Sequence, residues 1–194
     1  MFNAFSRLQA NLSTLQWVGV TIFTLLFNFW ATDLLNAAYA ASGFPVPYWE
    51  AQLSFDHQKL KGWYGVLQSN NAIELYLYTQ CIDFVFIASV FVLHISALVV
   101  VSRTLPASSK ARQFMLWAAL LSAIAPLSDA IENGISFVML ANPTSFEPLL
   151  ALAYSSSAAI KFAMFSFAYL AAGGGLLLAL YFWAMRAKRS PKAA

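Results

Sequence analysis

The sequence predicts an all-α fold, a polytopic membrane four-helix bundle with an amphipathic interfacial helix on its extracytoplasmic side. Of its 194 residues, 60% are hydrophobic and 10% are charged, whereas a soluble domain is about 25% charged. Four apolar stretches are each long enough to cross a bilayer, for which about 20 residues suffice. The polar stretch at 41–75 is rich in aromatic residues that suit the headgroup layer. We expect residues 1–194 to form a single transmembrane domain.

The first predicted span follows a short polar lead, residues 1–13. It is too long for the core of a signal peptide, although Ala38-Tyr39-Ala40 resembles a cleavage site. We therefore expect a retained helix. All four spans together cover residues 14–40, 76–102, 112–140 and 149–185.

The outer loop, 41–75, begins with helix-breaking residues from Gly43 to Pro47. The segment from Tyr48 to Gln68 then alternates aromatic and charged residues in an amphipathic pattern. Such a segment either lies in the membrane interface or covers a cavity in the bundle.

Basic residues predict the orientation of the chain. Arg7, three residues in 103–112 and four in the tail, 186–194, lie on one side of the membrane, and only Lys59 and Lys61 lie on the other. The positive-inside rule places the richer side in the cytoplasm. We expect a multi-pass protein of the cell inner (cytoplasmic) membrane with both termini cytoplasmic, which agrees with an even number of spans.

The third span carries two acids and an amide, Asp129, Glu132 and Asn133, at positions that share one helical face. An ionisable group inside a membrane is costly unless it is paired, hydrated or protonated, which indicates a functional or bundle-interior site. From the helical rise, the charged residues of the other spans lie at similar depths, about 9–16 Å below the outer ends. These are Asp33, Asp83 and Lys161. The shared layer predicts one polar pocket.

Four carboxylates facing one lysine would carry a net charge of −3, so we expect at least one to be protonated or cation-bound at neutral pH. Asp129 and Glu132, one turn apart, are the candidates to share a proton and are the candidate catalytic residues. Lys161 is their natural counter-ion, and Ser157 lies on its face of the helix. The candidate ligand-binding residues are Asp33, Asp83, Asn133, Lys161, Tyr76, Tyr78 and Gln80.

Several of these residues have structural interpretations as well. Lys161 with Asp129 or Glu132 would form an interhelical pair that only fixes register, and Asp33 and Asp83 would reach the headgroups. Pro126 predicts a kink. His94 predicts an interhelical hydrogen bond, and Gly173 to Gly175 predict close helix packing rather than a hinge.

The composition excludes several kinds of site. The single cysteine, Cys81, rules out an intramolecular disulfide, a CxxC redox pair and a thiolate zinc site. The two histidines lie in different segments, which disfavours a bis-histidine haem. We predict no cofactor and no metal. The basic residues lie at helix ends, so no nucleic-acid partner is expected.

Residues 62–170 resemble a family of uncharacterised bacterial four-helix integral membrane proteins. Its pattern is an Asp-x-x-Glu-Asn motif in the third helix, here Asp129 to Asn133, followed by ISFVML, a short Pro-containing turn and a lysine in the next helix. The tyrosine-rich entry to the second helix, from Tyr76 to Phe86, is also similar. The family has no established activity, so the resemblance implies a fold and no function.

A weaker architectural likeness is to the emopamil-binding and sigma-2 receptor group, which includes sterol isomerases. The shared layout is a small bundle, a long first outer loop with Trp63-Tyr64, and an acid just inside the second helix. The likeness implies that membrane-embedded acids protonate an alkene or bind an amine. The motif of the third helix departs from that group's pattern, so this is an analogy of architecture.

Three functions follow from the charged layer. The first is binding or modification of a lipophilic small molecule or membrane lipid, with a carboxyl group as general acid or as counter-ion to an amine. The second is a proton- or cation-coupled transporter or channel subunit, which with four spans would require a homo-oligomer. The third is a non-enzymatic membrane assembly protein. The sequence leaves open whether the protein is an enzyme.

Overall fold

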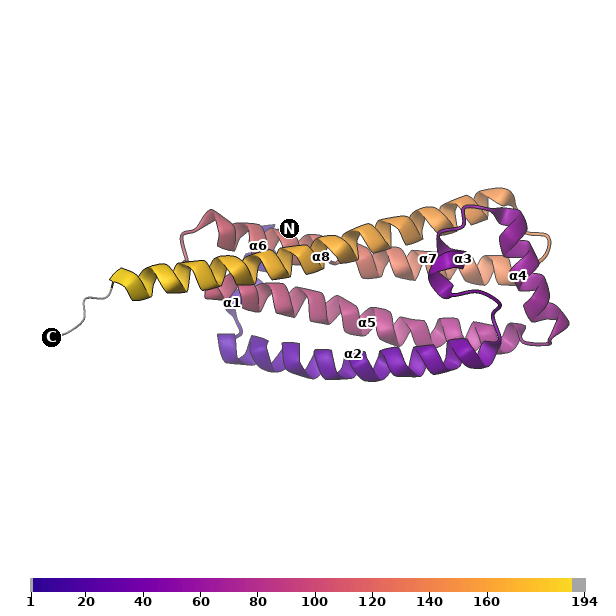
Figure 1. Cartoon of the computed structure of the whole chain (residues 1–194), viewed down its shortest axis with the longest axis horizontal. Coiled ribbons are helices and arrows are strands. Elements are labelled where there is room, and N and C mark those ends of the chain that lie inside the picture. The colour runs from indigo at the N-terminus through magenta and orange to yellow at the C-terminus, as the bar shows by residue number, and fades with distance from the viewer. Residues whose placement is uncertain (1, 190–194) are drawn as a thin grey trace.

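The computed structural model describes residues 2–189, and within that range the chain has eight helices and no strand (Figure 1). Four segments are long and apolar enough to cross a membrane, namely Thr14–Ser42, Ile73–Thr104, Lys110–Leu140 and Pro148–Met185. The predicted all-helical fold with four candidate membrane spans is therefore confirmed. The helices are α1 (Phe2–Ala10), α2 (Thr14–Ser42), α3 (Tyr48–Gln52), α4 (His57–Ser69), α5 (Ile73–Thr104), α6 (Lys110–Leu121), α7 (Ile124–Leu140) and α8 (Pro148–Arg189).

The ends of the helices follow from their capping residues. Ser13 begins α2 through a capping box with Gln16, in which each side chain binds the other residue's backbone N–H. Gly43 ends α2 in the left-handed conformation, with φ of 65°, which a residue without Cβ adopts at little cost. Asp56 caps α4 and Ser109 caps α6 by accepting backbone N–H groups.

Helix α5 is the central element of the bundle. It packs against α2 on one side and against α6, α7 and α8 on the other, while α7 packs along α8. Helix α2 has α5 as its main neighbour, so much of its surface remains exposed. Figure 1 shows the long helices side by side, with α3 and α4 across one end of the bundle and α1 near the other.

The third span is interrupted between α6 and α7, where Pro126 forces a break. Proline has no N–H, so it cannot donate to the carbonyl of Ser122, four residues earlier. That carbonyl instead accepts the N–H of Ala125 at 3.3 Å in a tighter turn, while the Ser122 hydroxyl donates to the Ala119 carbonyl at 2.8 Å. The kink predicted from Pro126 is therefore confirmed.

The outer loop forms two helices, α3 and α4, rather than one continuous segment. They are separated by residues 53–56, where Phe55 has a positive φ of 52°. Leu60, Tyr64 and Leu67 are spaced along one face of α4 and are fully buried. They pack with aromatic side chains of the bundle, so α4 closes this end of the protein. Their neighbours include Phe44, Tyr76, Phe146 and Tyr154.

At the opposite end, the polar lead forms a helix, α1, which the sequence analysis did not predict. Phe2 stacks on Trp117 of α6 with ring centroids 4.3 Å apart. The indole of Trp17 donates to the Gln9 carbonyl at 3.0 Å, and Arg103 donates to the same carbonyl. These contacts come from distant helices, so the tertiary structure stabilises a helix too short to form alone. Helix α8 continues through Arg189 into the predicted tail, whose residues 190–194 lie outside the described residues.

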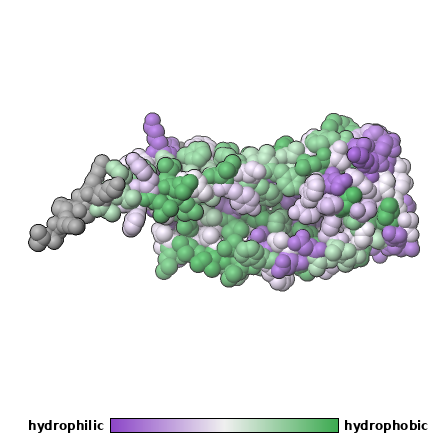
Figure 2. All heavy atoms as spheres, viewed as in Figure 1, coloured by the Kyte–Doolittle hydropathy of each residue, from purple (hydrophilic) through white to green (hydrophobic). Residues whose placement is uncertain are grey.

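The surface shows the distribution that a bilayer requires. Figure 2 shows hydrophobic atoms over the middle of the bundle and hydrophilic atoms concentrated at the end that carries α3 and α4. Large apolar side chains of α2 and α8, among them Phe23, Leu26, Leu170 and Trp183, are more than half exposed. A soluble monomer rarely exposes apolar surface this extensively, whereas lipid covers it without cost.

Of the three consecutive glycines of α8, Gly173 to Gly175, only Gly175 lies in close contact with neighbouring helices. A Cβ added to Gly175 would lie 2.5 Å from Val101 Cγ1 and 2.7 Å from Met115 Sδ, whereas one added to Gly173 or Gly174 would meet nothing within 4 Å. The close packing predicted for all three glycines is therefore found at Gly175 alone.

We expect Gly175→Ala to destabilise the protein by about 1–3 kcal/mol, because the extra methyl group forces α8 away from α5 and α6. Gly174→Ala is the matched control, and it should be neutral or slightly stabilising because alanine favours the helix. Thermal unfolding in detergent micelles checks both variants. Equal effects of the two substitutions would contradict the packing argument.

Candidate functional site

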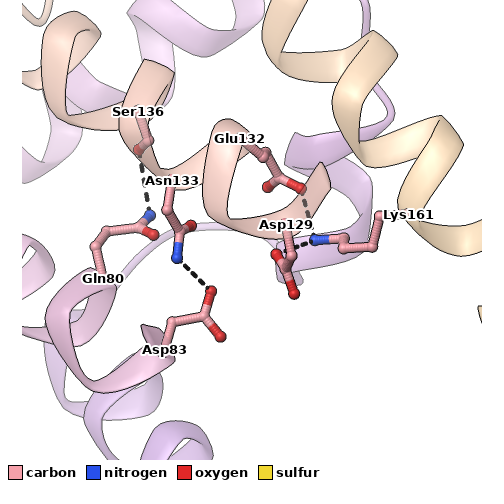
Figure 3. A network of polar contacts seen from close by, with 7 residues as sticks. All are labelled: Gln80, Asp83, Asp129, Glu132, Asn133, Ser136 and Lys161. Carbon is pink, nitrogen blue, oxygen red and sulfur yellow. Dashed lines mark hydrogen bonds and ion pairs between the residues drawn. The ribbon is translucent and has the colours of Figure 1, made fainter. Parts of the chain in front are cut away.

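Lys161 lies between two carboxylates at the contact of α7 and α8. Its Nζ is 2.9 Å from Asp129 Oδ1, to which it donates a hydrogen bond, and 2.6 Å from Glu132 Oε2 (Figure 3). The second contact is an ion pair without hydrogen-bond geometry, and Glu132 Oε1 has no partner among the described residues. All three side chains are buried. A lysine buried this deeply needs carboxylates beside it, because their charges offset the cost of removing its ammonium group from water.

A second part of the site joins α5 to α7. Asn133 Nδ2 donates to Asp83 Oδ2 at 2.7 Å, and Gln80 Nε2 donates to the Ser136 hydroxyl at 3.2 Å (Figure 3). The Tyr64 hydroxyl of α4 is 3.4 Å from the same Ser136 oxygen. Burial raises the pKa of the Tyr64 phenol, so it stays neutral and acts as a hydrogen-bonding group.

A pocket of about 420 Å³ lies beside these groups, lined by residues of α2, α3, α5, α7 and α8. Asp83, Asp129 and Lys161 lie in its wall, whereas Glu132 and Asn133 lie behind it. Most of the remaining wall is aromatic or aliphatic. Beside the charged groups, the lining consists of Thr32, Leu35, Asn36, Tyr39, Tyr48, Gln52, Tyr76, Thr79, Gln80, Phe86, Phe162, Phe165, Ser166 and Tyr169.

The pocket has more carboxylate groups than cations to balance them. Lys161 is shared by Asp129 and Glu132, and it is the only cation with an ion pair among the side chains that the structure describes. Asp83 is bound only by the neutral amide of Asn133. Figure 3 shows Asp83 and Asp129 each directing one oxygen away from its partner, and both residues line the pocket. The wall therefore offers acceptors to a ligand and has no free ammonium group.

Two of the predicted ligand-binding residues lie outside the site. Asp33 is exposed on α2, and Tyr78 is 60% exposed on α5. Neither lines the pocket. Each residue turns a helix by about 100°, so Asp33 points away from the face that carries Thr32 and Asn36, and Tyr78 lies opposite Tyr76. The prediction that four carboxylates converge was therefore wrong, because depth along a helix does not give direction around it.

The other predicted residues are brought together. Tyr76, Gln80, Asp83, Asp129 and Lys161 line the pocket, and Glu132 and Asn133 hold two of them from behind. Of the two candidate catalytic carboxylates, only Asp129 reaches the pocket, since Glu132 is 0% exposed and does not border it. Ser157 is half-buried and does not border it either.

The sequence analysis missed the aromatic wall and the polar residues of α2 and α3. Phe162, Phe165 and Tyr169 follow Lys161 along one face of α8, a periodicity that is visible in the sequence. Gln52 was not identifiable, because its position depends on how α3 folds against the bundle. Its Oε1 is buried without a hydrogen-bond partner among the described residues.

The arrangement suits an organic cation better than a metal ion. Within residues 2–189 no three His, Cys, Asp or Glu side chains lie close enough together to hold a metal. A bound ammonium group needs only one or two acceptors aimed at it, which Asp83 and Asp129 supply.

We expect Lys161→Met to destabilise the protein by about 3–5 kcal/mol, because it leaves Asp129 and Glu132 buried without their cation. Adding Glu132→Gln should recover part of that loss, since one fewer buried acid is left unpaired. Unfolding in mixed micelles measures the two variants against Lys59→Met, which changes an exposed lysine of α4. If the effects of Lys161→Met and Glu132→Gln on the free energy of unfolding simply add, the two side chains do not interact as the structure indicates.

The chain was also compared with known proteins. No protein-family model, no curated protein and no solved structure matches it. The resemblances described from the Asp-x-x-Glu-Asn motif and from the outer loop therefore stay predictions, and the site must be interpreted from its own geometry.

Proposed function

We propose that the chain is a membrane protein whose pocket binds a lipophilic molecule with a cationic head group. One observation carries the proposal: a pocket between membrane-spanning helices has an apolar, aromatic wall and two carboxylates without a full complement of cations. A cationic amphiphile matches both properties. Its head would lie at Asp83 and Asp129, and its chain would follow the aromatic wall.

The charge argument fixes the head group. An unpaired carboxylate in a membrane interior is unfavourable, and a cation that binds it removes that penalty. Lys161 already neutralises part of the charge of Asp129 and Glu132. Asp83 has no cationic partner within the described residues, so it is the strongest attachment point for an ammonium group. Hydrogen bonds to charged groups are roughly twice as strong as neutral ones.

The size and composition of the pocket fix the rest of the ligand. A volume of about 420 Å³ lies within the range of small-molecule sites, about 300–1,000 Å³. Phe86, Phe162 and Phe165 offer apolar surface beyond the carboxylates. An alkyl chain or a small fused-ring system fits such a wall, since its burial there replaces contact with lipid or water.

The pocket opens toward the side of the bundle. Asn36, Tyr48 and Ser166 line it and are also exposed on α2, α3 and α8. We infer that the ligand enters from the bilayer between α2 and α8, because α2 packs mainly on α5 and does not close this side. Such an entry route would admit molecules that partition into lipid and exclude soluble ones.

The orientation in the membrane forms part of the proposal. The end with α3 and α4 carries exposed Tyr48, Trp49 and Phe55, which suit the headgroup layer. We propose that these two helices lie in the outer interface. The basic segment 103–112, with both termini, would then face the cytoplasm of a cell with this protein in its inner membrane.

The alternative functions make different use of the same residues. A proton or cation relay would need polar groups along the rest of the bundle, and the only titratable side chain of α5 beyond Asp83 and before Arg103 is His94. An assembly role would need only the pair of α7 and α8 at Lys161. Neither accounts for a pocket whose wall displays Asp83 beside apolar surface.

We expect Asp83→Asn to weaken the binding of dodecylamine about tenfold or more, because the ammonium group loses a charge-assisted hydrogen bond. The amide substitution keeps the size of the side chain and its contact with Asn133. Native mass spectrometry of the full chain, titrated with dodecylamine in detergent, measures the affinity.

Asp33→Asn is the matched control, since it removes the same charge from an exposed site on α2. It should leave the affinity for dodecylamine unchanged. Equal weakening by both substitutions, or binding that neither affects, would mean that the amine does not occupy the pocket.

A further inference from the structure

His94 is a buried side chain that no group in the described part of the chain satisfies. It is 5% exposed, and neither of its ring nitrogens has a hydrogen-bond partner among the described residues. A neutral imidazole carries one donor and one acceptor. Buried polar groups are nearly always paired, because an unpaired one loses its hydration without compensation. The described part of the chain therefore leaves His94 without a partner, and its two nitrogens are free to bind another molecule.

The position of His94 connects it with the proposed binding site. It follows Asp83 by three turns of α5, so both side chains lie on nearly the same face, about 16 Å apart along the helix. Its ring meets the rings of Phe165 and Tyr169 edge-on, with centroids 5.5 and 5.3 Å away. Both rings line the pocket. Two aromatic side chains therefore form the boundary between His94 and the pocket.

The neighbouring polar groups on α5 do not account for the missing partner. The Ser89 hydroxyl donates to the Phe86 carbonyl at 2.6 Å, and the Ser96 hydroxyl donates to the Leu93 carbonyl at 3.1 Å. A water molecule bound to His94 would need further polar partners of its own, typically two to four in all. Phe165 offers no such group, and the hydroxyl of Tyr169 makes no hydrogen bond with His94.

We propose that His94 binds a second polar group of the ligand in this pocket, a hydroxyl or carbonyl about 16 Å from the cationic head. The inference rests on the proposed function and makes the ligand an amphiphile with polar groups at both ends. The head lies at Asp83 and Asp129, the chain runs along α8 past Phe165, and its far end reaches the imidazole. Tyr169 is 64% exposed, so its ring can turn toward the lipid and open this path with little loss of packing.

Two probes of equal chain length test the proposal. Dodecylamine has an amine at one end, and ω-aminododecanol adds a hydroxyl at the other, at a distance that an extended dodecyl chain spans. Native mass spectrometry of the full chain in detergent compares their affinities. We expect the wild-type protein to bind the amino alcohol about three- to tenfold tighter, the effect of one added hydrogen bond in a buried site.

Variants of His94 identify the group responsible. His94→Leu should abolish the preference for the amino alcohol, and His94→Gln, which keeps a donor and an acceptor, should retain part of it. His57→Leu is the matched control, because it removes the other histidine, on α4 and outside the pocket lining. It should leave the preference unchanged.

The outcomes separate this inference from the proposed function. The wild-type protein could bind the two probes with equal affinity while binding remains sensitive to Asp83→Asn. That result would overturn the proposed role of His94, whose partner would then be an internal water molecule. A preference that persists in His94→Leu would overturn it as well. Binding of both probes that is insensitive to Asp83→Asn would refute the occupied pocket itself, and with it both proposals. The wild-type comparison stands even where a variant fails to fold.

Discussion

The ion pairs of Lys161 with Asp129 and Glu132 constrain the rest of the bundle. A lysine at this depth is tolerated only where carboxylates lie within a few ångströms. Because both acids belong to α7 and the lysine to α8, the pairing fixes the axial register of these helices. It also fixes which face of α8 points inward, and that face continues from Lys161 along Phe162 and Phe165 into the pocket wall.

Helix α7 also fixes the position of α5, which lies on its other side from α8. Glu132 turns toward α8, while Asn133, the next residue, turns toward α5 and binds Asp83. The Asp-x-x-Glu-Asn motif therefore works as a connector with two faces, which holds α5 and α8 at a fixed distance and orients Asp83 beside Asp129. Only part of the motif has to touch a ligand, because Glu132 and Asn133 act through the residues that they hold.

The sequence predicted much of this arrangement and missed some of it for physical reasons. Four spans, the kink at Pro126 and the convergence of Asp83, Asp129, Glu132 and Lys161 follow from hydropathy and helical spacing, which are local properties. The inclusion of Asp33 was wrong because depth was estimated without rotation about the helix axis. The division of the outer loop into α3 and α4, the helix α1 and the position of Gln52 depend on contacts between distant segments, which no local pattern encodes.

The same constraint determines which wall of the pocket can move. Helices α5, α7 and α8 are tied together by buried charged and amide groups, so separating them would expose unpaired polar atoms to lipid, at a high cost in free energy. Helix α2 is held to α5 mainly by apolar packing. Its polar links to α5 are the Asn28–Ser89 hydrogen bond, the contact of Thr79 with the Ala38 carbonyl, and the hydrogen bond from Arg103 to the Thr14 hydroxyl at the end that we place on the cytoplasmic side. Lipid replaces apolar contacts at little cost. Displacement of α2 is therefore the least costly way to widen the pocket, and it does so on the side that faces the bilayer, where a lipophilic ligand would arrive.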